Sequence, residues 1–392
     1  MTVDTPTAWS TPPLLAWARD QVGLTIAEAA ARATVSPSSL QAWEDGSLRP
    51  ALAELERLAG TYDCPLGYFF LGEPPREPDA HLDFRGVAPE KVETLTYETR
   101  LRLRRFEKLM SYAGELSRLE DQPLVSSVGT ASLEEPVDSV VERETARLGL
   151  TQPIRDSWTS ANDAFGWWNA ALEGVGVFVI ALRLSASEIR GACVWQPGDP
   201  PGILVNRADA EAAAGRTFTL LHEYAHLLLR NPGVVCDFRG SPIAADVERF
   251  ANAFAAETVL PRTAFVQFLS ARGVSGYSVA WSDGQIDKLR EPFKVSRDTV
   301  AIMLERLGMA PSGFYRQRRL EWERRRPFGR GSGGGTKEAV RRVRDLGSNL
   351  SSLIAKASMN NRISILELAE LTDMKVDRTK EFLALAVASD RR

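Results

Sequence analysis

The chain has 392 residues, of which 44% are hydrophobic and 25% are charged. This composition excludes collagen-like, mucin-like and wholly disordered proteins, and the length predicts two or three domains. The net charge is −3, so the chain as a whole does not attract nucleic acid or an anionic membrane. Any such attraction must therefore be local.

The sequence carries no visible targeting segment. Its longest apolar run, from Val175 to Leu182, is far shorter than the roughly 18 residues that a membrane span needs. The first residues lack the basic and apolar regions of a secretory signal. Three widely spaced cysteines predict neither a disulfide framework nor a CxxC site. The simplest interpretation is a reduced, cytoplasmic protein.

Residues 12–73 are predicted to form a domain of short helices. Thr25 and Glu28 have the spacing of a capping box, which marks the start of a helix. Ser36 is a good cap for the next helix, and Pro37 occupies its first position, where the missing N–H costs nothing. The first helix is expected to contain Leu14 and Trp17. The helices that follow it are expected over 26–33, 37–44 and 50–62.

The middle of the chain is predicted to combine many helices with two strands. A proline-rich break over 72–79 separates it from the first domain. The apolar runs 175–182 and 202–206 have the pattern of buried strands. Helices are expected over 90–120, 136–148, 161–173, 209–229, 244–259, 261–272, 283–291, 296–308 and 311–326. The sequence therefore predicts a mainly α protein with a small β-sheet.

The end of the chain is predicted to be a separate helical module. A glycine-rich linker over 327–335 precedes it. Residues 336–392 are expected to contain three short helices, and no chemistry is visible in them. The expected domains are therefore 12–73, 80–326 and 336–392, and docking of a partner is a reasonable role for the last.

The strongest chemical signal is the HExxH motif that runs from His222 to His226. Residues four apart project from one face of a helix, so two imidazoles can share one zinc ion. Glu223, beside the first histidine, is then placed to act on water as a general base. The flanking apolar residues favour a helix with one buried stripe, formed by Phe218, Leu221, Ala225 and Leu228.

A catalytic zinc usually takes three protein ligands. Glu248 lies 22 residues after the second histidine on a predicted alanine-rich helix, a gap that fits two helices folded back on each other. Asn252 follows one turn later and is predicted to contact the metal ligands without binding the metal itself. Glu257 is the fallback ligand, and His81 and Cys236 are weaker candidates. The alternatives are two exposed histidines formed by chance, and a site that binds zinc without cleaving anything.

Two long segments, Arg216 to Leu229 and Val247 to Pro261, resemble the ImmA/IrrE family of metallopeptidases. The same resemblance extends to 201–207, 295–308 and Asp83-Phe84-Arg85, so it covers roughly residues 80–326. It implies a zincin-like domain in which His222, His226 and Glu248 bind zinc and Glu223 is the catalytic base. It also implies a cytoplasmic endopeptidase that cleaves a partner repressor in stress responses, phage induction or mobile-element control.

The first domain resembles the Xre-type helix-turn-helix of phage repressors. The matching residues are Leu24, Thr25, Ala29, Ala30, Val35, Ser36, Leu40, Trp43, Glu44, Gly46 and Pro50. The resemblance implies that the helix over about 37–43 enters the major groove of DNA. Its exposed polar candidates for DNA contacts are Ser38, Ser39 and Gln41.

The charge of this domain argues against tight DNA binding. Residues 1–75 carry four arginines against nine acidic residues, a net charge of −5, whereas phosphate contacts supply most non-specific affinity. A homodimer could still bind DNA through local geometry. The alternative is a module for protein docking or dimerisation.

Residues 314–344 form the basic segment of the chain. They hold eleven basic and three acidic residues, a net charge of +8, with aromatic residues interleaved. This mixture suits phosphate contacts and base stacking. The candidate nucleic-acid contacts are Arg316, Arg318, Arg319, Arg324, Arg325 and Arg326. The alternative is a solvated helix face paired with acidic groups of the same chain.

Together these features predict a zinc-dependent endopeptidase fused to a helix-turn-helix domain. Its expected substrate is a protein, in particular a repressor encoded nearby, so that proteolysis would regulate transcription. The competing hypothesis is a transcription regulator or antitoxin that binds a partner through the peptidase-like domain without cutting it. A nucleic-acid sensor in the basic segment is compatible with either.

Overall fold

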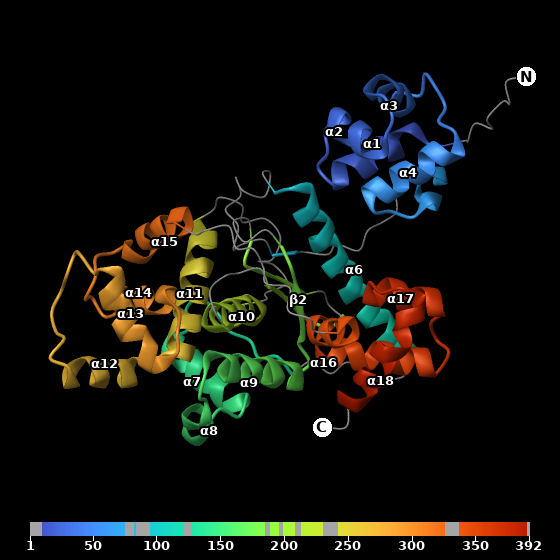
Figure 1. The fold of residues 1–392 in the computed structure, drawn as a ribbon. Helices are drawn as coiled ribbons and strands as arrows, with labels where there is room; N and C mark the ends of the chain where they lie inside the picture. Colours follow the sequence, from blue (N-terminus) through green and yellow to red (C-terminus); the bar gives the residue numbers. More distant parts are fainter. Residues whose placement is uncertain are drawn as a thin grey trace, which may run out of the picture. The chain divides into compact units, whose positions relative to one another are not determined.

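The computed structural model describes residues 10–74, 82–83, 95–120, 127–184, 189–195, 199–207, 213–229, 242–325 and 337–389. The chain divides into two compact units, one formed by 1–79 with 93–105 and the other by 80–92 with 106–392. The prediction of a mainly α protein with a small sheet is confirmed (Figure 1). No helix in the described part of the chain is both long and apolar enough to cross a membrane.

The first unit is a small helical domain. Its elements are α1 (Pro12–Gln21), α2 (Ile26–Ala33), α3 (Pro37–Glu44), α4 (Leu52–Tyr62), the 3-10 helix η1 (Leu66–Phe70) and the start of α6 (Tyr97–Leu119). Thr25 accepts from the Glu28 N–H at 3.3 Å and the Glu28 carboxylate accepts from the Thr25 N–H at 2.9 Å, which confirms the capping box. Ser36 caps α3 as predicted. The Tyr97 hydroxyl donates to the Thr61 carbonyl at 2.5 Å, so the start of α6 packs against α4.

The second unit contains a four-stranded sheet in the order β1-β3-β4-β2. Its strands are β1 (Leu82–Asp83), β2 (Phe178–Leu182), β3 (Gly191–Val194) and β4 (Gly202–Asn206). The two predicted strands appear as β2 and β4, which pair in parallel, while β3 pairs antiparallel with β4 and β1. The sequence missed β3, because four residues are too few to show a period.

This unit also contains a series of helices between α6 and the C-terminal segment. They are α7 (Val137–Arg147), α8 (Gln152–Ser157), α9 (Ala161–Gly174), α10 (Ala213–Leu228), α11 (Pro242–Val259), α12 (Arg262–Ala271), α13 (Asp283–Arg290), α14 (Arg297–Arg306) and α15 (Phe314–Arg325). Every residue from Thr217 to Leu228 is buried, because α9, α11, β3 and β4 all contact α10 (Figure 1). The expected single apolar stripe is therefore wrong, and the histidines themselves lie in the interior.

The C-terminal segment packs onto the sheet within the second unit. It contains α16 (Glu338–Met359), α17 (Ile365–Thr372) and α18 (Thr379–Ser389), and α16 contacts β2 (Figure 1). Gly347, with φ of 75°, interrupts α16 where the helix passes the strand. A Cβ at Gly347 would lie 2.5 Å from the Val179 carbonyl oxygen, so only glycine allows this approach. The predicted linker over 327–335 lies outside the described residues.

Candidate metal centre

Helix α10 is anchored by the tyrosine inside its HExxH motif. The Tyr224 hydroxyl donates to Glu144 Oε2 of α7 at 2.8 Å, and Arg147 contacts both side chains. The Glu144 side chain is 1% exposed, so this charge is buried and needs those partners. The network holds α10 on α7 and leaves the two histidines on another side of the helix.

Three donor side chains converge beside α10. His222 Nε2 and His226 Nε2 lie 3.1 Å apart, and Glu248 of α11 places carboxylate oxygens 3.5 Å and 3.3 Å from them. One ligand atom from each lies within 4.8 Å of the other two. Two ligands bound at about 2.0–2.1 Å to one tetrahedral zinc are about 3.3 Å apart, so the donor set and its spacing fit that ion.

The interior position of His222 suits a metal ligand. Burial lowers the pKa of His222 to about 3, although Glu248 acts in the opposite direction. The imidazole is therefore neutral near pH 7, and its ring keeps a lone pair for a metal. Nearby positive charge on Arg319 lowers the same pKa further.

Glu223 points to the sheet side of α10, where β3 passes close to it. Its side chain is buried, with the residue 2% exposed. A Cβ built on Gly191, the first residue of β3, would lie 3.0 Å from Glu223 Oε1 and 2.6 Å from Thr219 Cγ2. Gly191 therefore allows the strand to approach the carboxylate. Its only signal in the sequence is a weak one, a glycine that opens a short apolar run.

The two other site candidates on α11, Asn252 and Glu257, have different surroundings. Asn252 lies one turn after Glu248, and its side chain interacts with His222 and raises the pKa of that ring. Glu257 is not brought to the histidines. Its Oε1 accepts from the Arg262 N–H at 2.6 Å, which caps α12. His81 and Cys236 lie outside the described residues.

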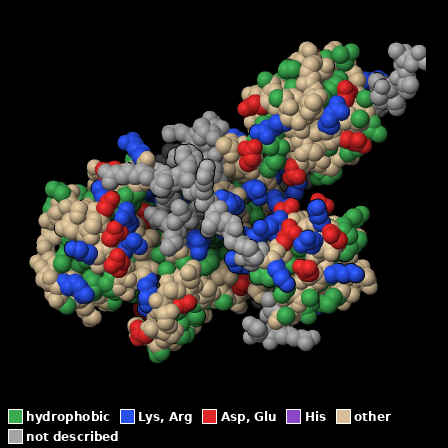
Figure 2. All heavy atoms as spheres, viewed as in Figure 1, with side chains coloured by type: hydrophobic (Ala, Val, Ile, Leu, Met, Phe, Trp, Pro, Cys, Tyr) green, Lys and Arg blue, Asp and Glu red, His purple; other side chains and the backbone are tan. Residues whose placement is uncertain are grey.

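The basic segment is partly committed to contacts within the second unit. Arg318 pairs with Asp283 and with Glu321, and it lies over the Trp322 ring. Lys and Arg side chains are interspersed with Asp and Glu side chains over the part of the surface around α13 to α15 (Figure 2). These contacts favour the interpretation of a paired helix face for Arg318.

The other arginines of this segment that were predicted to contact nucleic acid differ in exposure and in partners. Arg316 and Arg324 are exposed. Arg319 donates from Nη1 to the Tyr315 hydroxyl at 2.9 Å, and its positive charge lowers the pKa of His222. The Arg325 side chain and Arg326 lie outside the described residues. A role of these arginines in binding nucleic acid stays a prediction.

The helix-turn-helix candidates lie on α3. Ser38 and Gln41 are exposed, and Ser39 is half-buried. The Ser36 side chain contacts the Ser39 hydroxyl at 2.7 Å and the Ser38 hydroxyl at 3.0 Å, so both serines take part in the cap of α3. Gln41 lies about one turn beyond that cap, and contact of these residues with DNA stays a prediction.

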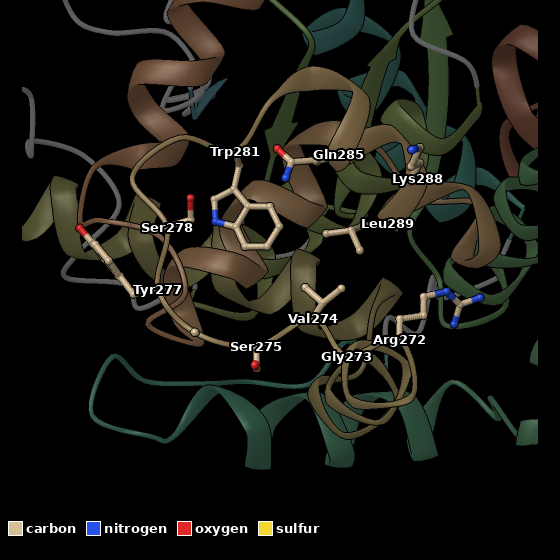
Figure 3. Close-up of a pocket in the computed structure, with 11 residues that line it drawn as sticks. Arg272, Gly273, Val274, Ser275, Tyr277, Ser278, Trp281, Gln285, Lys288 and Leu289 are labelled. Carbon is tan, nitrogen blue, oxygen red and sulfur yellow. The ribbon is translucent and has the colours of Figure 1, made fainter.

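A pocket of about 580 Å³ lies elsewhere in the second unit. It is formed by the loop after α12 together with α13, and the side chains of Val274, Trp281 and Leu289 point toward one another there (Figure 3). Trp281 is fixed by a hydrogen bond from Nε1 to the Met309 carbonyl at 2.9 Å. None of the predicted site residues lines this pocket.

The fold and the convergent donors define a metallopeptidase-like domain carried on the same chain as a helix-turn-helix domain. Residues 172–305 match the family model of the IrrE N-terminal-like domain, and residues 15–69 match a helix-turn-helix model. Over these two regions the resemblance to ImmA/IrrE-type proteins is confirmed. No curated protein and no solved structure matches the chain.

Proposed function

We propose that the protein is a zinc-dependent endopeptidase that acts in the cytoplasm on a partner protein. The observation that carries this proposal is the convergence of His222, His226 and Glu248 at zinc-ligand spacing, with Glu223 buried beside them. A zinc ion held by these three residues would polarise a peptide carbonyl and make water more acidic.

Glu223 is the proposed general base. It would take a proton from the attacking water and pass it to the leaving amine. The motif places it on the same helix as both histidines, and the surrounding helices and strands keep bulk water away from its carboxylate. Asn252 is proposed to orient His222.

The helix-turn-helix domain supports a regulatory substrate. A peptidase joined to a DNA-binding type of domain couples cleavage to transcription if its partner is a repressor. We therefore propose a repressor encoded nearby as the substrate, with cleavage in response to stress.

The test is co-expression of the protein with the products of its neighbouring genes, as wild type and as Glu223→Gln. Intact-mass spectrometry would follow the partners, and metal analysis would follow zinc. We expect zinc in both forms and a fragment only with wild type, because loss of a general base slows such reactions roughly 10²- to 10⁴-fold. Cleavage by the Glu223→Gln variant at the wild-type rate would exclude the mechanism.

A transcription regulator or antitoxin is the second candidate, favoured by the helix-turn-helix match over 15–69. In that case a neighbouring gene product would co-purify intact with both forms. Repression of the protein's own operon would then persist in Glu223→Gln and fall in Gln41→Ala. DNA binding through α3 would also weaken steeply with salt.

A further inference from the structure

The pocket beside α13 has an apolar part that is built into the fold. Its volume of about 580 Å³ lies within the range of about 300–1,000 Å³ that is typical of ligand-binding pockets. The side chains of Val274, Trp281 and Leu289 point toward one another there (Figure 3). Trp281 and Leu289 are 7% and 5% exposed, so neighbouring residues hold both side chains in place. The pocket therefore offers a fixed apolar surface to a group that enters it.

The loop between α12 and α13, which forms one side of the pocket, is held at both ends. At its start, the Val274 N–H donates to the Leu269 carbonyl at 3.0 Å. At its end, the Met309 carbonyl accepts from the Ser278 N–H and from Trp281 Nε1, each at 2.9 Å. The pocket is therefore formed before a ligand arrives, which reduces the entropy that binding would cost.

The lining of this pocket is positively charged. Of the eleven described residues that form it, Arg272 and Lys288 carry positive charge and none is Asp or Glu. The Arg272 guanidinium lies 3.6 Å from the centre of the Phe268 ring. Lys288 is exposed and has no ion pair or hydrogen bond with another residue in the described part of the chain. The pocket therefore favours a ligand that carries negative charge.

The acidic residues of α13 do not cancel this charge. Lys288 and Leu289 line the pocket, whereas Asp283 and Asp287 do not. Both aspartates instead form ion pairs with arginine side chains of α14 or α15. The helix thus directs its paired acidic groups toward the interior of the unit and an unpaired lysine toward the pocket.

Large side chains with apolar surface are also exposed at this place. Tyr277, which lines the pocket, is 60% exposed, and Val279, two residues further on, is 69% exposed. The Tyr277 hydroxyl makes no hydrogen bond with another described residue. Aromatic residues are enriched in protein interfaces, where a large apolar body and a polar tip are both used. An apolar surface that continues beyond the pocket favours a protein partner over a small molecule.

We propose that this pocket docks an acidic segment of a partner protein, with one large apolar side chain inserted against Val274, Trp281 and Leu289. Carboxylates beside that side chain pair with Lys288 and Arg272. A basic segment would meet like charges here, so the pocket selects its partner by charge. The inference rests on the proposed function in one respect, that the docked partner is also the protein that is cut.

The test measures the binding of short synthetic peptides to the full-length protein. The probe is a fluorescein-labelled peptide with one tryptophan between two pairs of glutamates. One control peptide carries glutamines in place of the glutamates, and the other carries serine in place of the tryptophan. Fluorescence anisotropy at a fixed, low salt concentration would give the Kd of each peptide.

Three protein variants locate the binding. Lys288→Glu reverses an exposed charge in the pocket. Gln285→Glu adds a negative charge to the lining and keeps an oxygen that accepts from the Ser282 N–H, so the cap of α13 is preserved. Lys380→Glu is the matched control, because Lys380 is exposed on α18 and does not line the pocket. Thermal unfolding would confirm that all three variants are folded.

We expect wild type to bind the serine peptide at least about tenfold more weakly than the probe, as for the loss of an aromatic anchor. An exposed ion pair is worth up to about fivefold in affinity. Lys288→Glu replaces this attraction with repulsion, so it should weaken the probe by about fivefold or more, and Gln285→Glu should weaken it as well. Both variants should bind the glutamine peptide as wild type does, and Lys380→Glu should match wild type with every peptide.

Three binding results would overturn the inference. The first is no binding of the probe, or equal binding of the probe and the glutamine peptide to wild type. The second is an equal loss in Lys288→Glu and Lys380→Glu, which would reduce the effect to net charge. The third comes from analytical ultracentrifugation: a wild-type dimer that dissociates in Lys288→Glu would assign the pocket to a second copy of the chain.

The co-expression assay separates this inference from the proposed function. The peptides report binding without cleavage, so the expected binding together with no partner fragment contradicts the proposed cleavage alone. If a partner is cut, Lys288→Glu and Gln285→Glu should both slow its cleavage. Cutting at the wild-type rate by both variants would show that the substrate docks elsewhere and would overturn the inference.

Discussion

Glu248 and Glu257 lie on the same helix and have different partners. Glu248 faces two imidazole nitrogens at 3.3 Å and 3.5 Å, whereas Glu257 caps α12 and lies 3.5 Å from Arg306. Burial raises the pKa of Glu257, and it is the N–H of Arg262 that favours its charged form. Helix α11 therefore carries one carboxylate placed among the candidate metal donors and another that caps the following helix.

This pair of glutamates supports a matched prediction at the residue scale. Loss of a group that hydrogen-bonds a metal ligand lowers metal affinity by up to roughly 100-fold. Glu248→Gln alters a proposed ligand itself, so it should lower the zinc affinity by more than that. Glu257→Gln keeps an oxygen that can accept from the Arg262 N–H, so it should retain zinc. Competition with a chromophoric chelator would measure both affinities, and equal affinities in the two variants would remove Glu248 from the ligand set.

At the scale of elements, the short strand β3 passes close to Glu223. It lies between β1 and β4 in the sheet, and α10 packs against it. The strand approaches α10 at Gly191, where a side chain would meet Thr219, Glu223 and the Leu204 carbonyl oxygen. Adding one carbon at Gly191 is therefore expected to affect both Glu223 and the packing of α10 on the strand.

We predict that Gly191→Ala lowers the free energy of unfolding by about 1–3 kcal/mol, as overpacking in a core usually does. It should also reduce cleavage, because Glu223 must shift to make room. Thermal unfolding would measure the first effect and the co-expression assay the second.

The control is Gly166→Ala in α9, where nothing lies within 4 Å of the new Cβ. Alanine there should stabilise the helix slightly, by up to about 1 kcal/mol. If Gly191→Ala unfolded at the wild-type temperature and cleaved normally, the close approach of β3 to Glu223 would have no functional meaning.

At the scale of the second unit, the C-terminal segment is held on the sheet by buried charge. Glu173 Oε1 accepts from the Asn349 N–H at 3.1 Å, and the Asn349 side chain donates to the Glu173 carbonyl at 2.8 Å. Arg207, which follows β4, pairs with Asp345 of α16. These contacts join residues far apart in the sequence and make α16 part of the peptidase-like unit.

Glu173 makes this docking depend on pH. Burial raises the pKa of Glu173 from 4.5 to about 7, so between these values the folded state binds a proton that the unfolded state has lost. The contribution to stability is therefore complete below about pH 4.5 and is lost as the pH rises through about 7. We expect α16 to show faster amide exchange at about pH 8 than at about pH 5.5, after correction for intrinsic exchange.

Glu173→Gln is the control for this prediction. A neutral amide oxygen can still accept from the Asn349 N–H, so α16 should stay docked with a weaker dependence on pH than in wild type. The same pH dependence in both proteins would assign the effect to another group, such as Asp345, whose pKa burial also raises.

The features that sequence predicted well are local. The capping box of Thr25 and Glu28 and the cap at Ser36 depend on groups three residues apart, and the HExxH spacing depends on the turn of one helix. Glu248 could also be chosen, because an alanine-rich helix at that distance can reach back to the histidines. These signals need only the short-range geometry of a helix, which is why the residues themselves carry them.

What the sequence alone determined was a mainly α protein with a helix-turn-helix domain, an HExxH helix and a third candidate ligand. Tertiary structure decided the rest: the burial of α10 on all sides, the presence of β3 with Gly191 against Glu223, and the docking of α16 on the sheet. Each of these depends on contacts between residues distant in the chain. Hydrogen bonds within a helix are set by neighbours, but packing partners and strand pairs are chosen only when the whole unit folds.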